Sequence, residues 1–165
     1  MALSELLAAT LERARDPKRA TDNGDVALTC AEPVLATVEW RSLQARLPRP
    51  LPPLLTHLYT EVGNGGYGPG YGLLEALHTV DGTLAFCEMY HLSLEQALTP
   101  FVYWGCTVYS VIELATGRVG ILDQDAVEDG CSPAEAAWWQ YQSVDDFWTA
   151  WLNGEELFFP VGDDE

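Results

Sequence analysis

The spacing of apolar residues in the first third of the chain is helical. One apolar face predicts a helix over residues 4–14 with Ser4 as its cap, and another predicts a helix over 38–45 with Thr37 as its cap. A third helix is expected over residues 51–62, where two prolines occupy the first turn and lose no backbone hydrogen bond there. The second and third helices are separated only by Pro48-Arg49-Pro50, so we expect them to pack as a pair. The apolar residues of the third helix are Leu54, Leu55, Leu58, Tyr59 and Val62.

The pattern changes to extended spacing in the second half. The clearest strand covers 107–114, where β-branched residues lie on both faces and favour a central position in a sheet. A hairpin loop then leads into a strand over 118–122. The turn signal Asp81-Gly82 predicts a hairpin between strands over 71–76 and 83–86. Further expected elements are a short extended piece at 26–30, a helix over 94–98 closed by Pro100, an extended stretch at 101–104 and a helical turn at Pro133.

The last helix is expected to begin after Ser143, with Asp146 completing a capping box. Its apolar stripe contains Phe147, Trp148, Trp151 and Leu152, and Gly154 ends it. The order of elements predicts one α+β domain over residues 1–165, with an antiparallel sheet and helices packed mainly on one face. Residues 162–165 are expected to form a disordered tail.

A glycine-rich segment follows the third helix. A turn this rich in glycine needs positive φ angles or close backbone approach. A phosphate-binding loop would follow a strand, open a helix and carry a lysine, whereas here a helix precedes the loop and no Lys or Arg lies between Pro50 and Gly117. We therefore interpret the segment as a structural turn. Its residues are Asn64, Gly65, Gly66, Gly68, Pro69, Gly70 and Gly72.

Together with two later motifs, this loop resembles the SUKH superfamily. The loop reads NGGYGPGYGLL, Trp104-Gly105-Cys106 stands before a strand, and an aromatic helix ends Ala150-Trp151-Leu152-Asn153-Gly154-Glu155. The resemblance covers about residues 38–158. It implies a SUKH-like domain of the kind found in bacterial toxin-immunity proteins and in relatives of yeast cell-wall-assembly regulators. The motifs, Trp104 included, mark the fold and imply no catalytic chemistry.

The net charge of −17 is distributed unevenly. Residues 1–49 hold seven basic and seven acidic residues, whereas residues 50–165 hold Arg118 against eighteen acidic residues. The whole imbalance therefore lies in the second part. Such a surface repels nucleic acid and anionic membranes and attracts a basic protein partner. The alternative is that the acidity only maintains solubility.

Residues with metal-binding or nucleophilic chemistry form no recognisable motif. The four cysteines make no CxxC pair and are expected to be small buried residues, and the three histidines lack ligand spacing. Asp123-x-Asp125 fails the EF-hand pattern, because the sixth and twelfth positions hold Glu128 and Ala134. We predict no cofactor and no metal, although a catalytic pair of carboxylates stays open as an alternative.

The predicted interface combines an acidic loop with a tryptophan. Adjacent side chains of an extended segment point to opposite faces, so at least one of Trp138 and Trp139 is a candidate for exposure. Exposed carboxylates suit docking of Lys or Arg, and tryptophan is frequent at interface hot spots. The alternative for each tryptophan is that it covers the edge of the last helix. The acidic members of this candidate site are Asp123, Asp125, Glu128 and Asp129.

These observations predict a non-enzymatic, cytoplasmic binding protein. The order of apolar, acidic and basic residues at the N-terminus is not that of a signal peptide, and no run is apolar and long enough to span a membrane. The resemblance implies that the partner is a cognate toxin domain, such as a nuclease or a deaminase. Two alternatives are an adaptor that binds an endogenous protein and an enzyme that acts through carboxylates.

Overall fold

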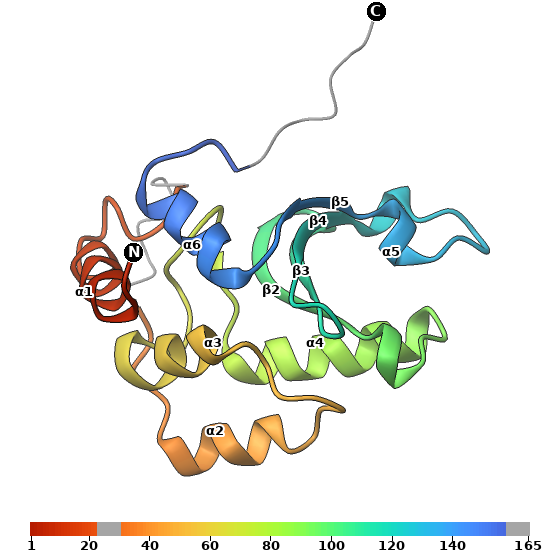
Figure 1. Ribbon diagram of the computed structural model, residues 1–165, viewed down its shortest axis with the longest axis horizontal. Coiled ribbons are helices and arrows are strands. Elements are labelled where there is room, and N and C mark those ends of the chain that lie inside the picture. The colour runs from red at the N-terminus through yellow and green to blue at the C-terminus, as the bar shows by residue number, and fades with distance from the viewer. Residues whose placement is uncertain (23–30, 158–165) are drawn as a thin grey trace, which may run out of the picture.

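The computed structural model describes residues 1–22 and 31–157 (Figure 1). These residues form one α+β unit in which an antiparallel sheet packs with helices, so the predicted fold class is confirmed. The expected extended piece at 26–30 and the expected tail at 162–165 lie outside the described residues. No helix in the described ranges combines the length and the apolar character needed to cross a membrane.

The first two helices and the last helix agree with the sequence pattern, and the first two differ from it by small shifts at their starts. The first two begin after Ala2 and Ala36, not after the expected caps Ser4 and Thr37, because glutamate three residues on accepts from the backbone N–H of each alanine, at 3.1 and 3.3 Å. Ser143 caps the last helix as predicted, since its Oγ accepts from Asp146 N at 3.1 Å. The α-helices are α1 Leu3–Ala14, α2 Thr37–Gln44, α3 Pro53–His57, α4 Ala76–Met89, α5 Pro133–Ala136 and α6 Val144–Leu152.

The sheet of the described residues has five strands in sequential order, and every neighbouring pair is antiparallel. The third strand is central, as its apolar faces predicted. The first strand is much shorter than the expected strand over 71–76, because α4 already begins at Ala76 with Glu75 as its cap. The strands are β1 Gly72–Leu73, β2 Leu98–Gly105, β3 Val108–Glu113, β4 Val119–Asp123 and β5 Trp138–Tyr141.

The expected hairpin around Asp81-Gly82 is wrong, because both residues lie inside α4. Gly82 permits close packing of the helix against β2: a Cβ at that position would come within 2.7 Å of Pro100 Cγ. The expected helix over 94–98 is also replaced. Only a 3₁₀ turn, η2 Leu94–Gln96, precedes β2, and Pro100 belongs to that strand.

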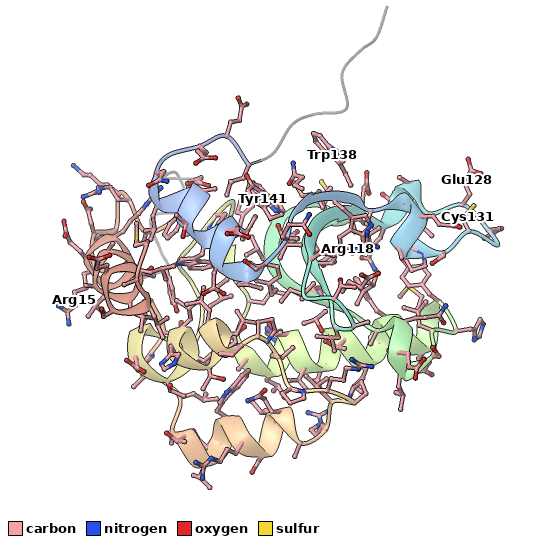
Figure 2. All side chains as sticks on the ribbon, in the orientation of Figure 1. Arg15, Arg118, Glu128, Cys131, Trp138 and Tyr141 are labelled. Carbon is pink, nitrogen blue, oxygen red and sulfur yellow. The ribbon has the colours of Figure 1, made fainter. Side chains whose placement is uncertain are left out.

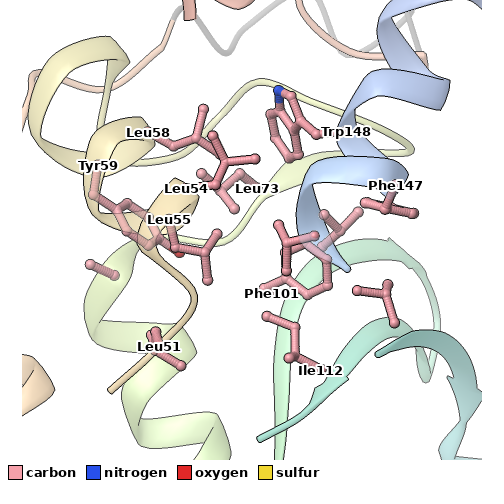
Figure 3. Close-up of a cluster of buried hydrophobic side chains, with 14 of the residues drawn as sticks. Leu51, Leu54, Leu55, Leu58, Tyr59, Leu73, Phe101, Ile112, Phe147 and Trp148 are labelled. Carbon is pink, nitrogen blue, oxygen red and sulfur yellow. The ribbon is translucent and has the colours of Figure 1, made fainter. Parts of the chain in front are cut away.

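The main core joins the α3 region, the sheet and α6 (Figure 3). α3 continues into a π-helical turn, η1 Leu58–Val62, and the expected pairing with α2 is confirmed by a tilted contact of the Trp40 and Tyr59 rings at 4.9 Å. From α6, Phe147 contacts Phe101 of β2 at 5.4 Å between ring centroids. On the opposite face of β3, Phe86 of α4 contacts Tyr109 at 6.3 Å, within a second, smaller cluster.

Candidate partner-binding surface

The acidic loop begins at the end of β4 and is anchored there. Asp123 Oδ1 accepts hydrogen bonds from Thr107 Oγ1 at 2.9 Å and from Asp125 N at 3.0 Å. Gln124 N donates to Thr107 O at 3.1 Å, so a short 3₁₀ turn, η3 Gln124–Ala126, continues directly from the hairpin. Asp123 therefore organises the start of the loop, while the carboxylate of Asp125 is exposed.

The second half of the loop faces the C-terminal end of α4. Glu128 and Asp129 are exposed and lie with Met89 and His91 around an open hollow of about 580 Å³. Sequence reasoning missed the contribution of α4, because it assigned residues 83–86 to a strand. The signal was present in the buried positions of the helix, which recur at intervals of three or four residues: Ala76, Thr79, Val80, Thr83 and Phe86.

The two adjacent tryptophans lie on opposite faces of β5, as the period of a strand predicts, and Figure 2 shows Trp138 on the outside of the sheet. Trp138 is opposite Ile121 in the register of β4 and is 45% exposed. Asp123 follows Ile121 by two residues in the same strand and so points to the same face. The structure thus places Trp138 and the start of the acidic loop on one side of the sheet.

Trp139 is packed instead. Its Nε1 donates to Ala134 O at 2.9 Å, and the guanidinium of Arg118 lies 4.0 Å from the centroid of its ring. Arg118 also forms two hydrogen bonds to Glu113, at 2.7 and 2.9 Å. These bonds lower the pKa of Glu113, although partial burial opposes the shift and a bond from Thr116 adds to it. Trp138 is therefore the exposed member of the pair.

The glycine-rich loop has the geometry of a tight structural turn. Gly68 and Gly70 have φ angles of 115° and 57°, and a Cβ at either would meet a tryptophan ring at 2.7 Å. Asn64 Oδ1 accepts from Ala76 N at 2.9 Å and so satisfies the start of α4. The loop therefore positions α4 and β1. Trp104 of β2, whose ring lies against Gly70, donates from Nε1 to Ser110 Oγ at 2.8 Å.

Asp22 holds this loop against both ends of the fold, a role that sequence reasoning missed. Its carboxylate accepts from Gly70 N at 3.0 Å and from Trp151 Nε1 at 2.9 Å. It also pairs with Arg13 at 3.2 Å, and the Arg13 guanidinium lies 3.9 Å from the centroid of the Trp151 ring. Burial of this cluster lowers the pKa of Arg13, although Asp22 opposes that shift.

Residues with metal-binding chemistry do not gather among the described residues, where no group of three or more His, Cys, Asp or Glu side chains is placed to hold an ion. The expectation that the cysteines are buried is wrong for Cys106 and Cys131, which are exposed in loops, and Cys87 is partly buried. Cys30 lies outside the described ranges. Burial raises the pKa of the Cys87 thiol, which reduces its nucleophilic thiolate form.

No protein-family model matches the chain, and neither does any curated protein sequence. The resemblance to the SUKH superfamily therefore continues to depend on the glycine-rich loop and the two tryptophan-containing motifs.

Proposed function

We propose that this chain is a SUKH-type immunity protein that acts in the cytoplasm by binding a basic toxin domain directly, without catalysis. The acidic loop and Trp138 form its binding surface. The carboxylates attract the partner, and the indole supplies a large apolar contact once the surfaces meet. A cleft that binds nucleic acid is basic. The carboxylates of this chain would occupy the positions of the nucleic-acid phosphates in that cleft, and so the chain would compete with the nucleic acid for it.

One observation carries this proposal: the only Lys or Arg residue after position 49 is already paired. Arg118 is held by Glu113 and by the ring of Trp139, while Asp125, Glu128 and Asp129 are exposed. A loop with four acidic residues among seven therefore has no basic neighbour in sequence to compensate it. Acidity that only maintained solubility would not require an exposed tryptophan beside it. Trp138 is exposed and lies on the same side of the sheet as Asp123.

The first test is protection from the toxin encoded beside this gene. Its C-terminal portion is expressed in a sensitive host with and without this protein, and growth should stop without it and recover with it. A purified pair should also bind. A neighbour that is harmless, or a toxin that this protein neither binds nor neutralises, contradicts the proposal. An endogenous partner captured in its place supports the adaptor alternative.

The second test locates the surface by charge reversal. Asp125, Glu128 and Asp129 are replaced together by lysine, leaving Asp123 in place because it anchors the loop. Association with the toxin should slow by about tenfold or more at low salt, and its salt dependence should weaken. The matched control replaces Glu12, Glu32 and Glu156 by lysine. These three residues are also exposed, so the control changes the net charge by the same amount at other positions. Equal effects of both sets contradict a localised surface.

A further inference from the structure

A groove lined by aromatic rings runs between α4 and the sheet, separate from the acidic loop. It encloses about 310 Å³. One face of α4 supplies His78, Gly82 and Phe86 at intervals of four residues, and the strands supply Pro100, Tyr103 and Tyr109. The groove exists because Gly82 brings the helix axis close to β2 at one point, where Pro100 fills the space that a side chain would need.

The rings along the groove form a continuous series. Tyr103 lies 5.6 Å from Tyr71 and 5.4 Å from Tyr109, measured between ring centroids, and Tyr109 lies 6.3 Å from Phe86. Tyr71 is 40% exposed, so the series extends from solvent to the buried contact with α4. Aromatic faces carry partial negative charge and attract cations. The groove is thus lined by apolar side chains, and the faces of its aromatic rings carry a negative electrostatic potential.

The charges around the groove favour a cationic occupant. Glu75 is exposed and precedes the first residue of α4, three residues before the groove-lining His78. The arginine that reaches α4 from the first part of the chain, Arg46, is paired with Asp81 at 2.6 Å. Arg118 is held by Glu113. Among the described Lys and Arg residues, none lines the groove.

We propose that this groove receives an arginine side chain from a basic segment of the protein partner. The aliphatic part of arginine fits the apolar walls, and its planar guanidinium stacks on the rings of Tyr103 and Tyr109. This inference depends on the proposed function for the identity of the partner, and it adds a second contact point to the acidic loop. The recognition of arginine itself is testable without the toxin.

The probe is a short glycine–serine peptide with one arginine, titrated into the full chain while the ring protons of the tyrosines are followed by NMR. We expect saturable shifts of Tyr103 and Tyr109, with a Kd on the order of 1 mM for one side chain. Citrulline has nearly the shape of arginine without its charge, and the citrulline peptide should bind about tenfold more weakly. Equal binding by citrulline or by norleucine overturns the proposal.

Two adjacent exposed positions of α4 provide a matched pair of variants. His78→Trp fills the groove, whereas Leu77→Trp adds the same ring at a residue that is 45% exposed and does not line it. The first should weaken peptide binding by about tenfold, and the second should leave it unchanged. An equal response of both variants overturns the proposal.

The same pair separates this inference from the proposed function. If His78→Trp protects cells from the toxin as well as Leu77→Trp does, the groove proposal fails while immunity stands. If the toxin is neither bound nor neutralised, but the tyrosines discriminate arginine from citrulline, immunity fails while the groove stands.

Discussion

Replacement of Arg118 tests how the fold separates the packed tryptophan from the exposed one. Arg118→Met keeps most of the aliphatic stem but removes the guanidinium that bonds Glu113 and stacks on Trp139. Glu113, which is only 16% exposed in the wild type, then loses its cation. We expect a loss of stability, together with greater mobility of the Trp139 ring.

The magnitude follows from the two contacts. The side chain of Arg118 is 37% exposed, so the ion pair is partly screened and contributes about 1–2 kcal/mol. Stacking on Trp139 adds about 0.5–1 kcal/mol. A total of about 2 kcal/mol corresponds to a decrease in Tm of roughly 4–8 °C for a domain of this size.

The assay is urea unfolding of the wild type, Arg118→Met, Glu113→Gln and the double variant. The double-mutant cycle should give a coupling energy of about 1 kcal/mol at neutral pH. Because the folded-state pKa of Glu113 lies below its ordinary value of 4.5, the stabilisation is present above that value and is lost as the pH falls through the folded pKa. A coupling energy near zero at neutral pH, or one that persists unchanged in acid, refutes the reasoning.

Three further substitutions have defined outcomes. Asp22→Ala removes one acceptor shared by α1, α6 and the glycine-rich loop, and should cost about 1–2 kcal/mol in the free energy of urea unfolding, with Asp22→Asn losing less. Gly70→Ala should cost more than about 2 kcal/mol because its Cβ would meet a carbonyl oxygen at 2.8 Å; Gly117→Ala, with φ of 79° and no atom within 4 Å, should cost about 1 kcal/mol, and equal losses would contradict the steric argument. Trp138→Ser should change Tm by only a few degrees yet weaken binding to the toxin about tenfold by titration calorimetry, and unchanged affinity would remove this residue from the interface.

The error at α4 shows why local signals were insufficient. Asp81-Gly82 has the composition of a hairpin turn, and the residues after it include Thr83 and Phe86, which are common in strands. In the structure Gly82 serves a long-range contact with Pro100, which no local pattern reveals. The spacing of the buried residues was nevertheless helical, so periodicity over fourteen residues was a better guide than one dipeptide.

Strands β3 and β4 and helix α6 could be predicted because their signals are local: β-branched runs, a hairpin loop and the Ser143 cap. The candidate site was predictable only in part. The period of a strand fixed Trp138 and Trp139 on opposite faces, but the choice of the exposed ring depends on where Arg118 lies. The aromatic groove between α4 and the sheet depends on the packing of α4, so it could not be inferred once residues 83–86 were assigned to a strand.

The uneven charge of the sequence becomes an orientation in space. Arg15 and Glu128 lie at opposite ends of the molecule (Figure 2), and α1 is distant from the loop between β4 and α5 (Figure 1). Two of the arginines before position 50 join the first part of the chain to the acidic part, since Arg13 donates to Trp151 O at 2.8 Å and Arg46 pairs with Asp81 at 2.6 Å. The basic partner proposed above would therefore be attracted mainly to the acidic end, because residues 1–49 carry no net charge. Such a field orients the encounter before contact, so the loop and Trp138 meet the partner first and any arginine that enters the groove does so after docking.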